Sequence, residues 1–431
     1  MHTFYNFKGF SKAQLNLFEP LTVLIGPNGS GKSNVIEAVE LFSFIAYGKP
    51  LHLISDYGNG SGEIRIRGGF QSCPRFGENS FRFQFTGKIN FDKKDLPFSY
   101  CVKIQVSPQP RIIDESLSFD NGPLIFKTLE HTKSGSSGDI RVEYNNFASG
   151  GHKPIVDVSN DRSVLSRYGE FSKGKNKQYE KCLKVVNGIM FYLRSSFIFD
   201  PNPKLMRSYE RIGNNILLRD GSNISAVLYD LKNDTKNPWK KESLLRIISW
   251  IKQLPEEPFK ELNFVKTKLN DVILGFKESE ESHFVDARVL SDGTLRSLAV
   301  LTALETVAPS SRVIIEELDN GLHPSRVNIL VEAIVSCCKR RKLNVLVTTH
   351  NPATLNSLLP EQLDGVVLCD WDGENKTFRL VRLPDLPLYP QLLERGRLGD
   401  LITRRIVDQY LSPNFGEEQK QKALEWLENL P

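Results

Sequence analysis

A phosphate-binding loop near the start of the chain constrains its fold more than any other feature. Residues 26–33 read Gly-Pro-Asn-Gly-Ser-Gly-Lys-Ser and match the G-x-x-x-x-G-K-[ST] motif at every fixed position. The apolar stretch Leu21–Ile25 before it predicts a buried strand, and apolar residues at positions 35, 38, 39 and 42 predict the core face of a helix after it. Backbone N–H groups of such a loop and the N-terminus of the helix attract phosphate oxygens. The sequence therefore predicts an α/β fold that binds a nucleoside triphosphate.

The side chains of this loop have separate expected roles. Lys32 is expected to reach the β- and γ-phosphates, and the Ser33 hydroxyl is expected to ligate Mg²⁺. A chance match in a glycine-rich turn is the alternative, and the strand and helix on either side argue against it. The residues predicted to contact the nucleotide are Asn28, Gly29, Ser30, Gly31, Lys32, Ser33 and Asn34.

Bulk composition places the chain among ordinary globular proteins. Its 431 residues are long for one hydrophobic core, so we expect two lobes or domains. The net charge of +5 permits nucleic-acid binding without arguing for it. Six cysteines without CxxC spacing suit a reducing cytosol. No apolar run approaches the length of a membrane span, and the N-terminus has no signal-peptide pattern. We expect a cytoplasmic protein without a membrane partner.

Four segments are predicted along the chain. Period-two alternation from Gly62 to Val106 predicts antiparallel strands, and the Gly- and Ser-rich stretch from Phe119 to Gly174 predicts loops and short hairpins. A helical pattern from about Lys181 to Phe276 has the look of an insertion, and α/β character returns from Leu290. The predicted domains are 1–175, the N-terminal part of a nucleotide-binding head with an antiparallel β lobe; 176–285, a mainly helical insertion; 286–385, the C-terminal part of the head; and 386–431, a helical tail.

Two acids follow a buried strand in the second half of the chain. Residues 312–317 read Arg-Val-Ile-Ile-Glu-Glu, so an apolar strand ends in Glu316 and Glu317. At such a position one acid can hold Mg²⁺, directly or through water, and a second can polarise the attacking water. Two solvated acids at a strand end are the alternative.

A second candidate cradle for an anion lies between the loop and the acidic strand. Ser291, Asp292 and Gly293 precede an apolar helical stretch, and a Ser and a Gly at a helix N-terminus can bind an anion. The same three residues would serve equally well as an ordinary helix cap. One nucleotide does not need two cradles from one chain, whereas two chains arranged head to tail would use both.

Two histidines follow the acidic strand. His350 ends the apolar strand of residues 345–350, where it could contact a γ-phosphate and register its loss. A single histidine is more often a structural hydrogen-bonding residue than a sensor. His323 precedes Pro324 in a sharp turn, and we expect it to stabilise that turn.

The order of these motifs resembles that of the ATP-binding-cassette ATPases. Within them it is similar to the RecF and structural-maintenance-of-chromosomes branch, and most like the stand-alone AAA family ATPases of prokaryotic defence and overcoming-lysogenization-defect type operons. The stretches that carry the resemblance are residues 6–10, 25–34, 290–296, and 314–324 taken with 348–352. The resemblance covers Met1–Phe44 and about Leu290–Leu355. It implies a P-loop ABC-type ATPase head with a mixed central sheet, an antiparallel β lobe and a helical insertion.

The resemblance also implies a reaction and an assembly. ATP would lie between the phosphate loop of one protomer and the Ser291–Gly293 signature of another, in a homodimer or higher oligomer that hydrolysis to ADP and phosphate would release. By position, Lys32 and Ser33 match the phosphate and Mg²⁺ residues. Glu316 matches the family's acid associated with Mg²⁺, Glu317 matches its catalytic glutamate, and His350 matches its switch histidine.

The chain departs from the family pattern in two places. The usual acidic pair is Asp then Glu, and here it is Glu316 then Glu317. The glutamine loop that senses the γ-phosphate has only Gln71 as a candidate. No coiled-coil heptads separate the two halves, so a chromosome-clamping arm is not expected.

Asp370 and Asp372 belong to a predicted hairpin turn rather than to a nuclease metal site.

Three functions are weighed on these grounds. The resemblance favours an ATPase that regulates a separately encoded effector, such as a nuclease or toxin, in anti-phage defence. A DNA-repair or recombination ATPase that binds DNA directly is the alternative, although the chain offers only modest basic runs at 173–177 and 339–342. The 6–10 motif and the large middle insertion argue against a transporter subunit.

Apolar helical faces after Leu392 could dock on a partner or pack on the chain's own core.

Overall fold

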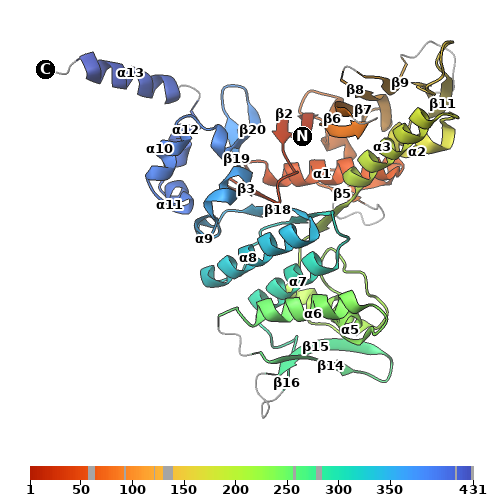
Figure 1. The fold of residues 1–431 in the computed structure, drawn as a ribbon. Coiled ribbons are helices and arrows are strands. Elements are labelled where there is room, and N and C mark those ends of the chain that lie inside the picture. The colour runs from red at the N-terminus through yellow and green to blue at the C-terminus, as the bar shows by residue number, and fades with distance from the viewer. Residues whose placement is uncertain are drawn as a thin grey trace. The chain divides into compact units, whose positions relative to one another are not determined.

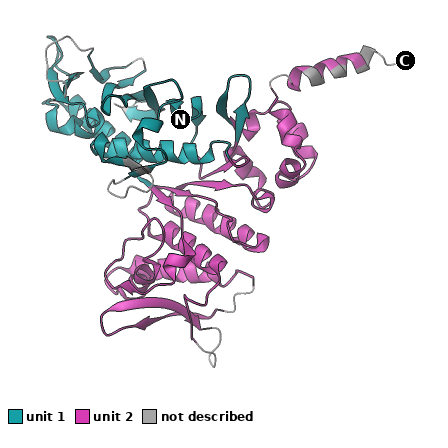
Figure 2. Cartoon of the chain, turned by 180° about the vertical axis from the view of Figure 1, so that it is seen from behind, with its two compact units in different colours: residues 1–18, 29–196, 369–380 teal, residues 19–28, 197–368, 381–431 magenta. Residues whose placement is uncertain are grey.

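The chain folds into two compact units, each assembled from separate stretches of sequence (Figure 2). The computed structural model describes residues 1–56, 64–91, 94–120, 122–129, 139–255, 259–277, 284–412 and 415–428. Unit 1 contains residues 1–18, 29–196 and 369–380, and unit 2 contains residues 19–28, 197–368 and 381–431. Two units agree with the expectation from chain length. The four domains predicted from sequence stay a prediction.

Unit 1 is built on an eight-stranded antiparallel sheet in the order β11-β10-β9-β8-β7-β6-β1-β2. Alternate side chains of β6 (Phe81, Phe83 and Phe85) are buried, as the period-two pattern predicts. The Phe42 ring of α1 (Lys32–Tyr47) lies 5.2 Å from the Phe83 ring, so α1 covers this face of the sheet (Figure 1). The predicted antiparallel β lobe is confirmed. The strands are β1 (His2–Phe7), β2 (Phe10–Leu15), β6 (Ser80–Phe91), β7 (Lys94–Gln105), β8 (Arg111–Phe119), β9 (Leu124–Thr128), β10 (Asp139–Tyr144) and β11 (Ile155–Ser159).

The stretch from 119 to 174 contains the predicted hairpins, and it also contains a helix that the sequence did not predict. This helix is α2 (Val164–Phe171), which packs beside α3 (Lys177–Arg194). Its first turn is capped by Glu115 of β8, whose carboxylate accepts the N–H groups of Val164 and Leu165, both at 2.8 Å. The capping acid lies 49 residues before the helix, so the local sequence gives no sign of it. Residues 121 and 130–138 of this stretch lie outside the described part of the chain.

The second large sheet has six strands in the order β12-β17-β18-β3-β19-β20. In unit 2, β17 is parallel to β18, β18 to β3, and β3 to β19. All five residues of β3 are buried, as its mostly apolar sequence predicts, and the strand lies between β18 and β19 in the sheet. The mixed central sheet is confirmed. The strands are β3 (Leu21–Ile25), β12 (Ser196–Phe199), β17 (Arg312–Ile315), β18 (Asn344–Thr349), β19 (Val366–Asp372) and β20 (Thr377–Arg382).

The β19–β20 hairpin has the turn chemistry expected of it. Asp372 accepts the backbone N–H groups of Glu374 and Asn375 at 3.1 Å, as an aspartate in a turn commonly does. Asp370 is bound by Arg379 at 2.6 Å. The prediction that these aspartates belong to a hairpin turn is confirmed.

Helices and a small antiparallel sheet complete unit 2 (Figure 1). Helices α5 (Ile224–Asn233) and α6 (Pro238–Ile251) pack on α7 (Asp292–Thr306), and α7 packs on α8 (Pro324–Arg341). The helical pattern predicted from Lys181 to Phe276 is wrong at its end, because β14 (Glu261–Lys266) and β15 (Asp271–Lys277) form a hairpin there. Strands β13 (Glu210–Arg211) and β16 (Phe284–Asp286) flank β15.

The C-terminal region of unit 2 is helical, as predicted. Leu392, Leu398 and Leu401 are buried in the core cluster of this unit, so α10 to α12 pack on the chain itself. Of the two possibilities left open for this region, the structure therefore shows packing on the chain's own core for these helices. The helices are α10 (Tyr389–Glu394), α11 (Leu398–Thr403), α12 (Ile406–Tyr410) and α13 (Phe415–Glu428).

Several short elements connect the larger ones. In the described part of the chain, no helix is both long enough and apolar enough to cross a membrane. The short elements are β4 (Ile54–Asp56), β5 (Ile64–Ile66), α4 (Pro203–Met206), α9 (Pro352–Asn356) and the 3₁₀ helices η1 (Leu51–Leu53), η2 (Phe70–Ser72), η3 (Pro360–Gly365) and η4 (Leu383–Asp385).

Candidate functional site

The predicted acidic pair lies at the carboxyl edge of the parallel strands of unit 2. All four residues of β17 are buried, whereas Glu316 is half-buried and Glu317 is exposed. The Glu316 carboxylate lies 3.8 Å from the guanidinium of Arg219. The two carboxylates therefore follow a buried strand directly and lie at the edge where ligands bind in open parallel sheets.

The backbone of Glu317 is held in an uncommon conformation. Its φ is +45°, in the left-handed region, which costs a non-glycine residue about 1–2 kcal/mol. The Glu317 N–H donates to Thr348 Oγ1 of β18 at 2.9 Å, and the side chain accepts from Asn320 at 3.1 Å. Such strain persists where surrounding contacts hold it, and it is often associated with function.

The predicted switch histidine shares this edge. His350 directly follows β18 and is exposed, and Thr349 pairs in register with Ile25 of β3. The residue after β3 is Gly26, the first of the phosphate loop, so the ends of β17, β18 and β3 all meet at one edge of unit 2.

Asp319 fastens the turn after the acidic pair to the end of β18, a role that the sequence did not indicate. Its buried carboxylate accepts from Thr349 Oγ1 at 2.8 Å and from Thr354 Oγ1 at 3.0 Å. The turn ends at His323, whose ring caps α8 by accepting from Ser325 N–H. His323 therefore acts as the predicted turn residue.

The Ser291–Gly293 signature begins α7. Ser291 Oγ accepts the Thr294 N–H at 3.0 Å, so Ser291 is the N-cap of this helix. The helix cap is therefore present, the Ser291 and Asp292 side chains are exposed, and the binding of a nucleotide by Ser291, Asp292 and Gly293 stays a prediction. Arg207, which sequence reasoning missed, binds the Asp292 carboxylate at 2.6 Å and the Leu290 carbonyl at 2.7 Å.

Gly293 lies where the start of α7 meets the turn after the acidic pair. A Cβ at this position would lie 3.1 Å from the Gly321 carbonyl oxygen and 3.3 Å from the Leu322 side chain. Only glycine fits this approach without movement of the turn. Unit 2 thus brings the signature, the turn and the acidic strand end into one connected group.

The phosphate loop itself divides between the units. Gly26, Pro27 and Asn28 continue β3 in unit 2, and the loop from Gly29 onward belongs to unit 1. Gly29 and Gly31 have φ of +80° and +96°, conformations that explain the two glycines. Helix α1 begins at Lys32, followed by Ser33 and Asn34. Its N-cap residue is Gly31, so no side chain caps the first N–H groups of the helix.

Three features of the unit 1 part of the loop suit a phosphate ligand. The N-terminus of α1 has no side-chain cap and no acid in its first turn. Ser30 Oγ is buried without a hydrogen-bond partner among the described residues. A Cβ at Gly29 would meet nothing within 4 Å, so the backbone there is open to a ligand. The donor set therefore fits the oxygens of a nucleoside triphosphate.

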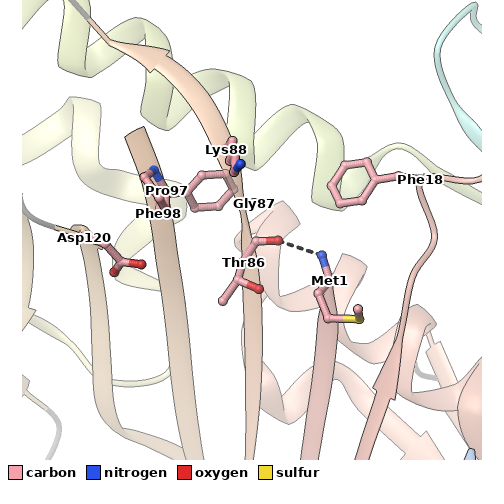
Figure 3. A pocket seen from close by; sticks show the side chains of 8 residues that line it. All are labelled: Met1, Phe18, Thr86, Gly87, Lys88, Pro97, Phe98 and Asp120. Carbon is pink, nitrogen blue, oxygen red and sulfur yellow. Dashed lines mark hydrogen bonds between the residues drawn. The ribbon is translucent and has the colours of Figure 1, made fainter. Parts of the chain in front are cut away.

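Gln71 and a pocket are two further features of unit 1. Gln71, the candidate for the glutamine loop, lies in η2 of unit 1 and donates to the Val106 carbonyl at 3.1 Å, and its role stays a prediction. Unit 1 also has a pocket of about 540 Å³, and no predicted site residue is among the described residues that line it (Figure 3). The lining residues are Met1, Phe18, Thr86, Gly87, Lys88, Pro97, Phe98 and Asp120.

Comparison with known proteins decides the family. A family model described as "AAA domain, putative AbiEii toxin, Type IV TA system" matches residues 21–356, which include β3, both acids and His350. The chain belongs to this family. The predicted resemblance to AAA family ATPases is confirmed, and the protein is an ATPase of this type.

Individual relatives are distant. A protein of Helicobacter pylori (strain ATCC 700392 / 26695) named ATP/GTP phosphatase is 23% identical over 362 residues, which are 80% of this chain and 83% of the relative. The SMC head bound to the C-winged helix domain of ScpA is 12% identical with a TM-score of 0.43, covering 88% of this chain and 96% of that chain. The SMC head domain from Thermotoga maritima is 13% identical with a TM-score of 0.41, covering 88% and 97%.

Proposed function

We propose that this ATPase forms a head-to-tail dimer in which each ATP lies between two copies. The phosphate loop of one copy binds the triphosphate, and the Ser291–Gly293 signature of the other completes the site. The observation that supports this proposal is the exposed start of α7, where the Ser291 and Asp292 side chains are accessible to a second copy, in addition to the uncapped start of α1 in the same chain. One nucleotide needs one helix N-terminus at its phosphates, so the second is available for a nucleotide held by another copy.

The residues of the chain have distinct roles in the proposed reaction. Lys32 and the loop N–H groups bind the phosphates, and Glu317 accepts the proton of the attacking water. His350, exposed at the end of β18, contacts the γ-phosphate. Ser33 and Glu316 are the residues that would hold Mg²⁺, and the ion would neutralise charge on the phosphate oxygens. Glu316 is one methylene longer than the aspartate usual at its position, and a carboxylate there still provides the oxygen ligand that Mg²⁺ prefers.

The dimer is proposed to regulate a separately encoded effector in the cytoplasm as part of anti-phage defence. The family description, which includes a toxin and a toxin–antitoxin system, supports a toxic effector such as a nuclease. The name of the Helicobacter pylori relative, ATP/GTP phosphatase, supports hydrolysis as the step that resets the assembly. Duplex-DNA titration at several salt concentrations tests the alternative, because tight binding that weakens steeply with salt would favour direct DNA action.

Substitution of the catalytic acid tests the dimer. Glu317→Gln removes the proton acceptor but keeps the size of the side chain, so hydrolysis should fall by at least about 100-fold while ATP binding persists. The ATP-bound dimer should then accumulate and sediment as a dimer, and the added Lys32→Ala substitution should abolish it.

Glu374→Gln is the matched control, because Glu374 is an exposed acid in the β19–β20 turn and should leave both readouts unchanged. A Glu317→Gln protein that remains monomeric at saturating ATP would contradict the sandwich. Unchanged hydrolysis in Glu317→Gln would contradict the assignment of the catalytic acid.

A further inference from the structure

A buried arginine links the signature helix to the acidic pair. Arg296 lies in the first turns of α7, three residues after Gly293, and its side chain is buried. Its Nη2 donates to the carbonyl oxygens of Glu316 at 2.9 Å and Glu317 at 3.0 Å, and its Nη1 donates to the Pro201 carbonyl at 3.1 Å. One guanidinium therefore connects α7 to the backbone of both acids within unit 2.

The chemistry of this contact differs from that of an ordinary ion pair. The acceptors are backbone carbonyls, so the guanidinium fixes peptide planes and leaves the carboxylates available for other partners. Burial lowers the pKa of Arg296, whereas the charges of Asp200, Glu317 and Asp319 raise it. An arginine remains charged in such a setting, and its rigid planar fork directs Nη2 at the two glutamate carbonyls while Nη1 binds Pro201, an arrangement that a lysine ammonium does not reproduce.

The same glutamate is also held by β18. Thr348 Oγ1 accepts the Glu317 N–H at 2.9 Å, and Arg296 binds the Glu317 carbonyl. The two contacts fix the peptide planes before and after a residue whose φ is +45°. The direction of the Glu317 side chain therefore depends on where α7 lies as well as on β18.

We infer that Arg296 is a positioning residue that couples the Ser291–Gly293 signature to the catalytic glutamate of the same chain. A nucleotide from the second copy that engages the start of α7 changes the position of Arg296, and this changes the orientation of Glu317. Hydrolysis in one site thereby depends on occupancy of the other. The inference rests on the proposed function of Glu317 and goes beyond it, since it assigns a residue and a route of coupling.

A double-substitution experiment tests the coupling. Arg296→Lys keeps the charge but loses the fork, so kcat for ATP should fall by about 10- to 100-fold through misplacement of Glu317. The dissociation constant for ATP in the monomer should stay within about twofold. In the Glu317→Gln background the same substitution should lower the residual rate no further, because Arg296 acts through Glu317. Arg296→Gln, whose amide can donate to one carbonyl, is measured in parallel so that the result does not depend on one variant.

Arg341→Lys is the matched control. Arg341 also binds two backbone carbonyls, those of Leu304 and Val307, at the other end of the same helix. Arg341→Lys should lower thermal stability. It should leave unchanged the ratio of the ATP hydrolysis rates measured with Glu317 and with Gln at position 317. Equal fold-losses from Arg296→Lys in both backgrounds, or an unchanged kcat, would overturn the inference. If Glu317→Gln alone hydrolyses ATP at the full rate, the proposed function of Glu317 fails instead, and the two failures are thus distinguishable.

Discussion

At the scale of single residues, the signature of this chain carries a charge that needs an explanation. Asp292 places a carboxylate at the start of α7, where the proposed ligand is itself an anion. Like charges at an interface weaken association. Arg207 binds this carboxylate at 2.6 Å and also holds the Leu290 carbonyl just before the signature. Arg207 therefore neutralises the acid and orients it, although 85 residues separate the two in sequence, which no local pattern could reveal.

Replacing this arginine should weaken the dimer. Arg207→Gln leaves the Asp292 charge unbalanced, so the ATP concentration for half-maximal association of the Glu317→Gln protein should rise by about tenfold. The added Asp292→Asn substitution should restore most of the loss, because it removes the repulsion. Sedimentation velocity across an ATP titration measures both. An Asp292→Asn substitution that fails to rescue would show that Arg207 acts by another route.

At the scale of elements, the contact between α7 and the 319–322 turn sets the geometry of the signature. Gly293→Ala should place a methyl group 3.1 Å from the Gly321 carbonyl oxygen, which is backbone and cannot rotate away. We expect a loss of about 1–3 kcal/mol in the free energy of unfolding, measured by urea denaturation.

Gly188 in α3 provides the control for this prediction. It is an exposed helical glycine whose added Cβ would meet nothing within 4 Å. Gly188→Ala should therefore stabilise the protein by about 0.5–1 kcal/mol through the lower backbone entropy of the unfolded chain. If both substitutions stabilise equally, the close approach at Gly293 is not a constraint.

The elements that sequence reasoning missed were missed for different physical reasons. Helix α2 has a local N-cap, Ser163, and a second cap from the distant Glu115 of β8, and the β14–β15 hairpin was mistaken for helix. Strand β15 is a short apolar run buried on both faces, and such a run has no periodicity that separates strand from helix. A Cβ built on Gly275 of this strand would lie 2.5 Å from the Val285 carbonyl oxygen of β16. This close approach depends on tertiary structure.

At the scale of the whole molecule, the motifs and the presence of two units were predictable, whereas the way in which the chain divides between the units was not. The phosphate loop, the acids and His350 are local patterns attached to buried strands, so each could be read from the sequence. Strand β3 pairs with β18 and β19, which lie more than 300 residues later, and the chain therefore crosses between the units several times. Long-range pairing of this kind leaves no trace in composition or periodicity.

The cysteines provide a probe of both units at once. All six are free, and burial is the main cause that raises the pKa of each thiol, to about 11 for Cys101 and Cys337 and to about 12 for the other four. The thiolate is the reactive form, so at pH 8 the native protein should react with iodoacetamide far more slowly than the unfolded chain, whose thiols have ordinary pKa values near 8.5. Cys101, which is only half-buried, should react first.

Mass spectrometry of protein labelled in increasing urea would then report on the two units separately. Cys337 and Cys338 belong to unit 2 and the other four cysteines to unit 1. If the units unfold independently, the pair in unit 2 should become reactive at a urea concentration different from that for the buried cysteines of unit 1. A single common midpoint for all buried thiols would show instead that the units unfold as one. Rapid labelling of all six thiols in native buffer would contradict the burial that raises their pKa values.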